Sequence, residues 1–242
     1  RRLDGIMYNG ASYDANENAL KFVGSSSTTA NSSDKIQSTY DWGSTAPAHT
    51  FSVWFKRTAN LTDWEWICSF GQHNNTGGNP GILISGDTHT EGGNIISFDT
   101  YNDQVTVQHT VELNVWTHVV ATFNAASAAW STDNCKIYVN GELKAGTNAV
   151  AGTFNLVGNE ITLGATNDGT RGFTGSISNF KLYDCALTAD EAKTLYDMGR
   201  CDEGGHIVNF SKTRVGIGLG DGEAPHDELD VRGNVRGSDN VI

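Results

Sequence analysis

Apolar and polar residues alternate along most of this chain, which is the period expected of strands with one buried face. The alternation is seen in "HTFSVWFKR" at 49–57, in "WTHVVATFN" at 116–124 and in "FTGSISNFKLYD" at 173–184. The same pattern gives further strands at 19–23, 64–71, 81–85, 94–101, 104–111, 135–143 and 160–165. Sheets with one apolar face must bury that face against each other, so the chain is predicted to be an all-β, two-sheet antiparallel sandwich.

One segment, "LTADEAKTLYDMG" at 187–199, departs from this period and predicts a single short helix at about 188–198. Thr188 and Glu191 have the spacing of a capping box, in which each side chain bonds the backbone N–H of the other residue. Asp190 favours the positive end of a helix, and Gly199 suits the left-handed position that ends one.

The closing stretch, "TRVGIGLGDGEAPHDELDVRGNVRG" at 213–237, has isolated Val, Ile and Leu residues between glycines and charges. One copy of such a segment cannot bury enough apolar surface to build its own core. We therefore expect an extended C-terminal segment that something else must cover.

The hydrophobic content and the net charge of the chain limit the classes of partner that it is expected to bind. The chain has 242 residues, 38% hydrophobic residues and 28 glycines, which is typical of a soluble protein rich in turns. No run approaches the roughly 18 apolar residues of a membrane span, and the first residues show no hydrophobic signal core. The chain also lacks an initiating Met, which fits a piece of a longer polypeptide. The net charge of −12 repels phosphate backbones and anionic headgroups, so we expect neither nucleic-acid nor membrane binding, whereas neutral polymers stay open.

The four cysteines do not have the spacing of a disulfide framework. Cys185 and Cys201 flank the predicted helix, which would hold their Cα atoms apart, and Cys68 and Cys135 lie inside predicted strands. We expect all four to be reduced and the protein to assemble in a reducing compartment.

Five fragments in order carry a resemblance to a known family: "WTHVVATFN", "KIYVNGEL", "ITLGA", "FTGSISNF" and the helix after "CALT". Together they resemble the laminin-G-like, concanavalin-A-like jelly-roll superfamily over residues 19–199. The resemblance implies a jelly-roll domain at 1–204 whose members mostly bind or cut carbohydrate and sometimes only bind protein. Many members have Asp where this chain has Ser178, which argues against a Ca²⁺ site at that position. Strand parity and family position together predict a core of Trp116, Val119, Ala121, Phe123, Ile137, Val139, Ile177 and Phe180.

The fragments "VGIG" and "LDVRGNV" in the closing stretch resemble a segment that precedes the intramolecular chaperone of phage tailspikes and large-virus fibre proteins, where three chains intertwine. The resemblance implies that residues 205–242 form a homotrimerising segment that buries Val215, Ile217, Leu229 and Val231 against two further copies. It also implies a virion protein, assembled in the host cytoplasm and acting at the host cell surface.

Alternation within 94–101 and 104–111 points Asp99, Tyr101 and Gln108 away from the core. Carboxylate and amide groups bind sugar hydroxyls and an aromatic ring covers the C–H surface, so this face is a candidate for binding a polysaccharide. An ordinary solvated sheet is the alternative interpretation.

Whether the protein is an enzyme stays open at this stage. His73 opens the loop "HNNTGGNPG" and, with Tyr101, is a candidate for proton transfer. A lyase also needs a cation or amide beside a uronate, which Arg171 and Gln108 could supply, with His109 an alternative to His73. A hydrolase needs two carboxylates, and "DWEW" at 63–66 lacks the third acid of the usual glucanase string.

The loop "TNDG" at 166–169 offers oxygen ligands, and Asp168 is a candidate Ca²⁺ ligand there. Such Asx-rich turns more often exist for conformational reasons. No other cofactor is expected. The sequence therefore leads to the hypothesis of a virion fibre module that recognises, and in one version of the hypothesis also degrades, a polysaccharide of the host cell surface or cell wall. One alternative is a polysaccharide lyase or glycoside hydrolase with a non-standard site. The other is a purely structural fibre head that binds protein.

Overall fold

The computed structural model describes residues 5–25, 29–42, 46–59, 63–85, 95–150, 152–199, 208–210, 215–217 and 229–231. The chain divides into two compact units, Arg1–Thr194 and Leu195–Ile242, which are described separately. The predicted boundary near residue 204 lies outside the described residues and stays a prediction.

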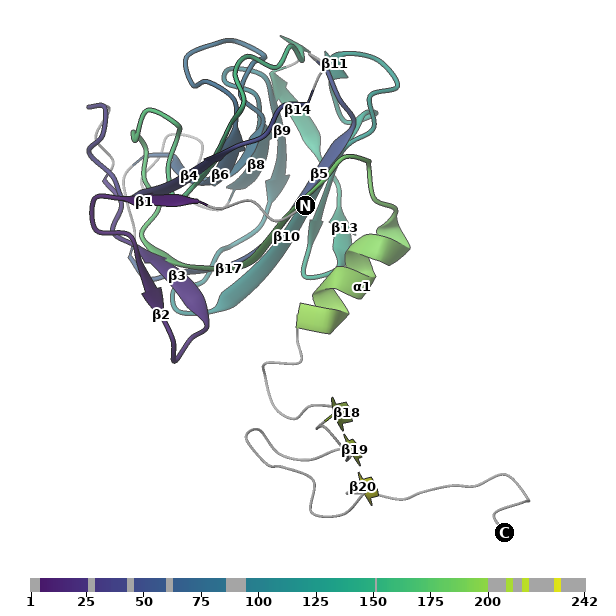
Figure 1. Cartoon of the computed structure of the whole chain (residues 1–242). Coiled ribbons are helices and arrows are strands. Elements are labelled where there is room, and N and C mark those ends of the chain that lie inside the picture. The colour runs from purple at the N-terminus through teal and green to yellow at the C-terminus, as the bar shows by residue number, and fades with distance from the viewer. Residues whose placement is uncertain are drawn as a thin grey trace. The chain divides into compact units, whose positions relative to one another are not determined.

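Two antiparallel sheets make up the first unit (Figure 1). The larger sheet has the strand order β1, β4, β16, β6, β7, β8, β9, β14, and the smaller has the order β13, β12, β10, β5, β17, β3, β2. The strands of the larger sheet are β1 (Ile6–Tyr8), β4 (Lys35–Thr39), β16 (Glu160–Leu163), β6 (Glu65–Phe70), β7 (Gly81–Ile84), β8 (Ile95–Asp99), β9 (Gln104–Gln108) and β14 (Thr147–Val150). Those of the smaller sheet are β13 (Glu142–Lys144), β12 (Cys135–Val139), β10 (Trp116–Phe123), β5 (His49–Arg57), β17 (Gly175–Tyr183), β3 (Ala19–Phe22) and β2 (Ser12–Asp14). A two-stranded ribbon pairs β11 (Ala129–Trp130) with β15 (Gly152–Thr153). The predicted sandwich is confirmed.

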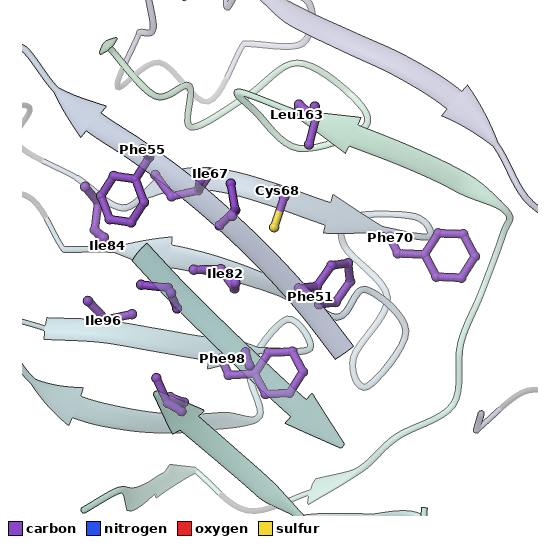
Figure 2. Close-up of a cluster of buried hydrophobic side chains, with 14 of the residues drawn as sticks. Phe51, Phe55, Ile67, Cys68, Phe70, Ile82, Ile84, Ile96, Phe98 and Leu163 are labelled. Carbon is purple, nitrogen blue, oxygen red and sulfur yellow. The ribbon is translucent and has the colours of Figure 1, made fainter. Parts of the chain in front are cut away.

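The core lies between the two sheets, where alternate residues from both layers interdigitate. Figure 2 shows Phe51 and Phe55 of β5 against Ile67, Ile82 and Ile96 of the larger sheet. Of the predicted core residues, Val119, Ala121, Phe123, Ile137, Val139 and Ile177 are fully buried. Phe180 is half-buried. Trp116 was predicted wrongly: it has the parity of His118 rather than of Val119, so its half-exposed ring lies on the outer face, 5.3 Å from Lys56 Nζ.

A buried ion pair crosses the core at one end of the sandwich. Arg57 ends β5 on the core face, and its Nη2 lies 2.5 Å from Glu65 Oε1 at the start of β6. Both side chains are fully buried, and Glu65 also accepts a hydrogen bond from the backbone N–H of Thr174. Glu65, the second of the two acids in the "DWEW" string, is therefore an inter-sheet structural group.

Two further titratable side chains are buried, His49 in the core and His118 on the outer face of the smaller sheet. His49 lies among the rings of Phe123, Trp130 and Phe154, and its Nδ1 bonds the carbonyl of Pro47. His118 stacks on Trp54 and bonds Ser52 Oγ. Burial lowers the pKa of each imidazole to about 4, so both are neutral at pH 7.

The predicted helix is confirmed as α1 (Ala189–Gly199). Its capping box is formed: Glu191 N–H donates to Thr188 Oγ1, and Glu191 Oε2 accepts from the Thr188 N–H and hydroxyl. Among the helical residues the structure describes, none form a stretch long and apolar enough to cross a membrane.

Three short strands are described in the second unit: β18 (Val208–Phe210), β19 (Val215–Ile217) and β20 (Leu229–Val231). β18 pairs with β19 antiparallel, and β19 pairs with β20 in parallel. In that register Val215 is the partner of Leu229, and Ile217 is the partner of Val231. The four apolar positions singled out in the sequence thus pair within one chain.

Among the described cysteines, Cys68, Cys135 and Cys185 are free thiols. Burial raises the pKa of Cys68 and of Cys135 to about 12, so both behave as small apolar residues. Cys201 lies outside the described residues.

Candidate functional site

The outer face of the larger sheet carries a row of polar residues that runs across its strands. Cross-strand pairing links Gln37 to Thr162, Thr162 to Ser69, Ser69 to Gly81, Gly81 to Asp99 and Asp99 to Gln104. Because successive side chains in a strand point to opposite faces, this polar row has the apolar core directly beneath it.

The ring of Trp66 lies over the one position in the row that has no side chain. A Cβ added to Gly81 would lie 2.6 Å from the Trp66 ring and 2.4 Å from the carbonyl oxygen of Cys68. Glycine therefore makes room for the indole between Ser69 and Asp99. Trp66 is 2% exposed and is buried with Trp64, Leu83 and Ile95.

The loop that follows β16 returns over this face. The carbonyl of Asn167 accepts hydrogen bonds from Lys35 Nζ and Gln37 Nε2, and its side-chain oxygen accepts the backbone N–H of His73. The backbone N–H of Trp66 also bonds the carbonyl of Arg171. These bonds connect segments far apart in the sequence and fix His73 beside Trp66, with 6.0 Å between the ring centroids.

His73 pairs with Asp168 in this loop, with 3.3 Å between Nδ1 and Oδ2. The other Asp168 oxygen accepts from the hydroxyls of Thr166 and Thr170. Although burial alone would raise it, these hydrogen bonds and His73 hold the pKa of Asp168 below its usual value. Burial lowers the pKa of His73, Asp168 opposes that shift and Arg171 adds to it, so the imidazole is neutral at pH 7.

Tyr101 completes the cluster from the hairpin between β8 and β9. Tyr101 and Asn102 have φ values of 59° and 75°, as in a type I′ turn, and Thr100 N–H bonds the carbonyl of Asp103. A positive φ is costly for an aromatic residue, and the Asp99 carboxylate holds it by accepting the Tyr101 N–H. The Tyr101 ring lies 4.8 Å from the His73 ring, edge to face.

Two charged groups lie at the rim of the cluster. Arg171, also at positive φ, has its Nη1 3.9 Å from Asp63 Oδ1, and both side chains are about one-third exposed. Asn74 and Asn102 are exposed; Asn74 bonds Asp168, and Asn102 bonds Thr76. We call His73, Tyr101, Asp168 and Arg171, with exposed Asn74 and Asn102, the His73 cluster.

The structure places two of the predicted binding residues apart from the His73 cluster or below the surface. Gln108 is exposed on the outer face but pairs with Ile95, at the other end of β8 from Asp99, which at about 3.3 Å per residue puts it roughly 13 Å away. Asp99 is only 5% exposed and accepts the backbone N–H of Tyr101, so it positions the turn, and its role in binding a ligand stays a prediction. The other four, His73, Tyr101, Asp168 and Arg171, are brought together.

The carboxylates in and around the cluster are each engaged by this chain's own donors: Asp168 by two hydroxyls, Asp99 by the Tyr101 N–H and Glu65 by Arg57. Over the described ranges no three His, Cys, Asp or Glu side chains gather in a way that could hold a metal ion. A Ca²⁺ ion at Asp168 would have to compete with the Thr166 and Thr170 hydroxyls at one oxygen or with His73 and Asn74 at the other.

Sequence reasoning missed Trp66 and Gly81, on which the cluster rests. In the sequence, Trp66 was considered only as part of "DWEW", which lacks the third acid of the glucanase motif. The signal that would have found it is the pairing of a large outward ring with a glycine on the next strand, and this needs the register of β6 and β7, which contains an irregularity at Trp66.

Residues 24–193 match the family model described as the concanavalin A-like lectin/glucanases superfamily, and the chain belongs to that superfamily. No curated protein sequence matches the chain. A solved structure of a Bacteroides ovatus protein proposed to bind carbohydrate is similar over 72% of this chain and 45% of its own, at 19% identity and a TM-score of 0.50. The botulinum neurotoxin serotype G binding domain is similar over 84% of this chain and 48% of its own, at 15% identity and a TM-score of 0.57.

Domain 4 of AbnA, an extracellular arabinanase from Geobacillus stearothermophilus solved in complex with arabinotriose, is similar over 79% of this chain and 87% of its own. Its identity is 17% and its TM-score 0.56. At these identities the likeness concerns the fold alone. The chain spans less than half the length of the first two of these structures.

Proposed function

We propose that the protein binds carbohydrate and that the His73 cluster is the binding site. The observation that carries the proposal is the series of rings from Trp66 through His73 to Tyr101, of which the outermost is held by a turn with unfavourable φ. Strained residues held firmly by their surroundings are concentrated at functional sites.

The chemistry of the rim fits a sugar. Tyr101 is half-exposed and offers a ring to a C–H face, while the amides of Asn74 and Asn102 and the charged groups of Asp168 and Arg171 suit hydroxyls. The net charge of −12 favours a neutral polymer over a strongly anionic one. Carbohydrate ligands in proteins of this fold, such as the arabinotriose of AbnA domain 4, support the proposal.

Changing Tyr101 to Ala is expected to weaken binding roughly tenfold, since a lost ring contact or hydrogen bond amounts to about 1–2 kcal/mol. The probes are a glycan array and soluble arabinan, with affinity measured by calorimetry on any ligand that binds. Gln108→Ala is the matched control because Gln108 is exposed on the same face of the sheet but away from the cluster. Equal affinities for parent and Tyr101→Ala would contradict the proposed site.

The finer proposal is that the ligand is a polysaccharide of a host cell surface or wall and that the protein is part of a virion fibre. Its support is the resemblance of the "VGIG" and "LDVRGNV" fragments to tailspike and fibre proteins. The assembly proposed is a homotrimer through residues 205–242. Three-residue strands such as β18, β19 and β20 are too short to be stable as an isolated sheet, which favours cover from further copies.

Deleting residues 205–242 is expected to convert a trimer into a folded monomer. The sandwich should survive because its strands and its core all lie before residue 200. Analytical ultracentrifugation gives the mass, and circular dichroism reports the fold. A stable monomer of the full chain at micromolar concentration would rule out the trimer.

Degradation of the polysaccharide is a second candidate function, favoured by the His73–Asp168 hydrogen bond, which suits an imidazole that transfers protons. Release of reducing ends would indicate a hydrolase, and absorbance of unsaturated uronate would indicate a lyase. If the parent neither binds nor cuts any wall fraction, a structural head that contacts protein is the function that is left.

A further inference from the structure

An apolar opening lies where the two sheets meet, on the core side of the larger sheet, whereas the His73 cluster lies over the outer face of that sheet. It has a volume of about 610 Å³ and is lined by Met7, Ile36, Ile161 and Leu163 of the larger sheet and by Leu20 and Phe180 of the smaller one. A volume of this size is typical of a site that holds a ligand or an inserted segment. Here the sandwich interior is open at its edge.

Within the described ranges, the edge of β17 that borders this opening is paired with a strand only over Gly175 to Ile177. β17 pairs with β5 as far as Tyr183, but its pairing with β3 on the other side covers only Gly175 to Ile177. Among the described residues, the stretch 178–183 therefore has β5 on one side and no strand on the other. Such an edge presents unpaired backbone N–H and C=O groups to an extended chain.

A bulge sets the two faces of this edge. The register of β17 on β5 shifts between Ser178 and Lys181, where Asn179 has a φ of 51°. After the bulge Leu182 lies opposite core residue Phe51, whereas Lys181 lies opposite Ser52, on the outer face near His118. An added strand would thus meet the apolar side chains of the opening on its inner side and Lys181, which also contributes to the lining, beside them.

The positive charge of Lys181 indicates that the partner carries an acidic group. Lys181 Nζ bonds the side-chain oxygen of Asn179 at 2.6 Å, and no ion pair joins it to any carboxylate in the described part of the chain. Partial burial lowers the pKa of Lys181, so an acidic partner would relieve a desolvated cation. Met7 of β1, which lines the opening opposite Ile36, adds apolar surface there and is 49% exposed.

We propose that the free edge of β17 accepts an extended peptide strand from another protein, one that places apolar side chains in the opening and a carboxylate opposite Lys181. The backbone would pair with 178–183, the alternate inward residues would cover Leu20, Phe180 and Leu182, and the outward acid would meet Lys181. A second copy of this chain, pairing through the same edge, is disfavoured as the partner because the stretch 178–183 contains no carboxylate to place opposite Lys181. An apolar small molecule would leave the edge unpaired.

The test uses the full chain and a capped peptide of about seven residues in which valine alternates with serine and the central outward residue is glutamate. Amide chemical shifts and hydrogen exchange report the site. The matched peptide has the same side chains with alternate backbone nitrogens methylated, which removes the strand donors. Lys181→Glu is compared with Lys136→Glu, a charge reversal at an exposed lysine of β12 in the same sheet.

We expect shift changes confined to 178–183 and the lining of the opening, slower exchange of amides along that edge, and no binding of the methylated peptide. Lys181→Glu should raise the Kd at least about tenfold, while Lys136→Glu should leave it unchanged. An apolar dye is tested alongside the peptides. Equal binding of the methylated peptide would contradict strand addition, and so would binding of the dye at these residues without binding of the peptide; either result would indicate an apolar pocket instead. Protection of 178–183 through self-association, or no perturbation at millimolar peptide, would overturn it as well.

Discussion

Replacing Arg57 with methionine should lower the free energy of unfolding by about 3–5 kcal/mol, because it leaves the Glu65 carboxylate buried without its counter-charge. Both partners are inaccessible to water, which therefore cannot solvate the remaining charge. Urea unfolding followed by tryptophan fluorescence measures the loss.

The double variant Arg57→Met/Glu65→Leu is the control that separates charge from packing. Replacing a whole buried ion pair by apolar residues is often neutral or stabilising, so most of the stability should return. A remaining deficit of about 1 kcal/mol is expected from the lost hydrogen bond of the Thr174 N–H. A double variant no better than Arg57→Met would show that the site requires the pair for its shape.

Lowering the pH from 7 to 5 should cost about 4 kcal/mol of stability, roughly 2 kcal/mol from each of His49 and His118. Their folded pKa values of about 4 lie below the ordinary value of 6.5. The unfolded chain therefore binds more protons between pH 6.5 and pH 4, and stability falls as the pH drops through that window. The range above pH 5 is chosen because carboxylates with lowered pKa, such as Asp168, lose their contribution only in stronger acid.

His49→Phe and His118→Gln should each remove about half of this pH dependence, since each deletes one titrating group. Glutamine at 118 can still bond Ser52, and phenylalanine at 49 suits the surrounding rings. Urea unfolding at pH 7, 6 and 5 gives the slopes. Equal stability of the parent at pH 7 and pH 5 would mean that the imidazoles accept protons without unfolding.

The sequence was sufficient to predict the strands that bury one face against the core, because their alternation is complete. It did not predict β1, β2 and β4. All three residues of β1 are exposed, and β4 has Ile36 as its one strongly apolar residue, so neither has an alternation to detect. Such strands, at the edge of a sheet as β1 and β2 are or next to it as β4 is, are defined by the neighbours they pair with, which is information that a single strand does not contain.

For the candidate site, the residue types were predictable and the distances were not. The sequence indicated His73 as a candidate because it is an imidazole in a loop, and Tyr101 because it is an aromatic residue after a strand. Their partner Asp168 lies 95 residues from His73 and was considered only as a metal ligand. Gln108 was placed on the correct face, but parity says nothing about position along a strand, and that position separates it from Asp99.

The two faces of the larger sheet have different roles, and this affects which residues of the protein can be substituted. Asn74, Tyr101, Asn102 and Asp168 belong to three turns that rest on the outer face, and the packed core occupies the other face. Residues in these turns can therefore be substituted without changing the side chains that stabilise the sandwich. The scaffold can therefore acquire new recognition properties by drift at a few surface positions, and a library randomised there would sample many specificities while each member still folds.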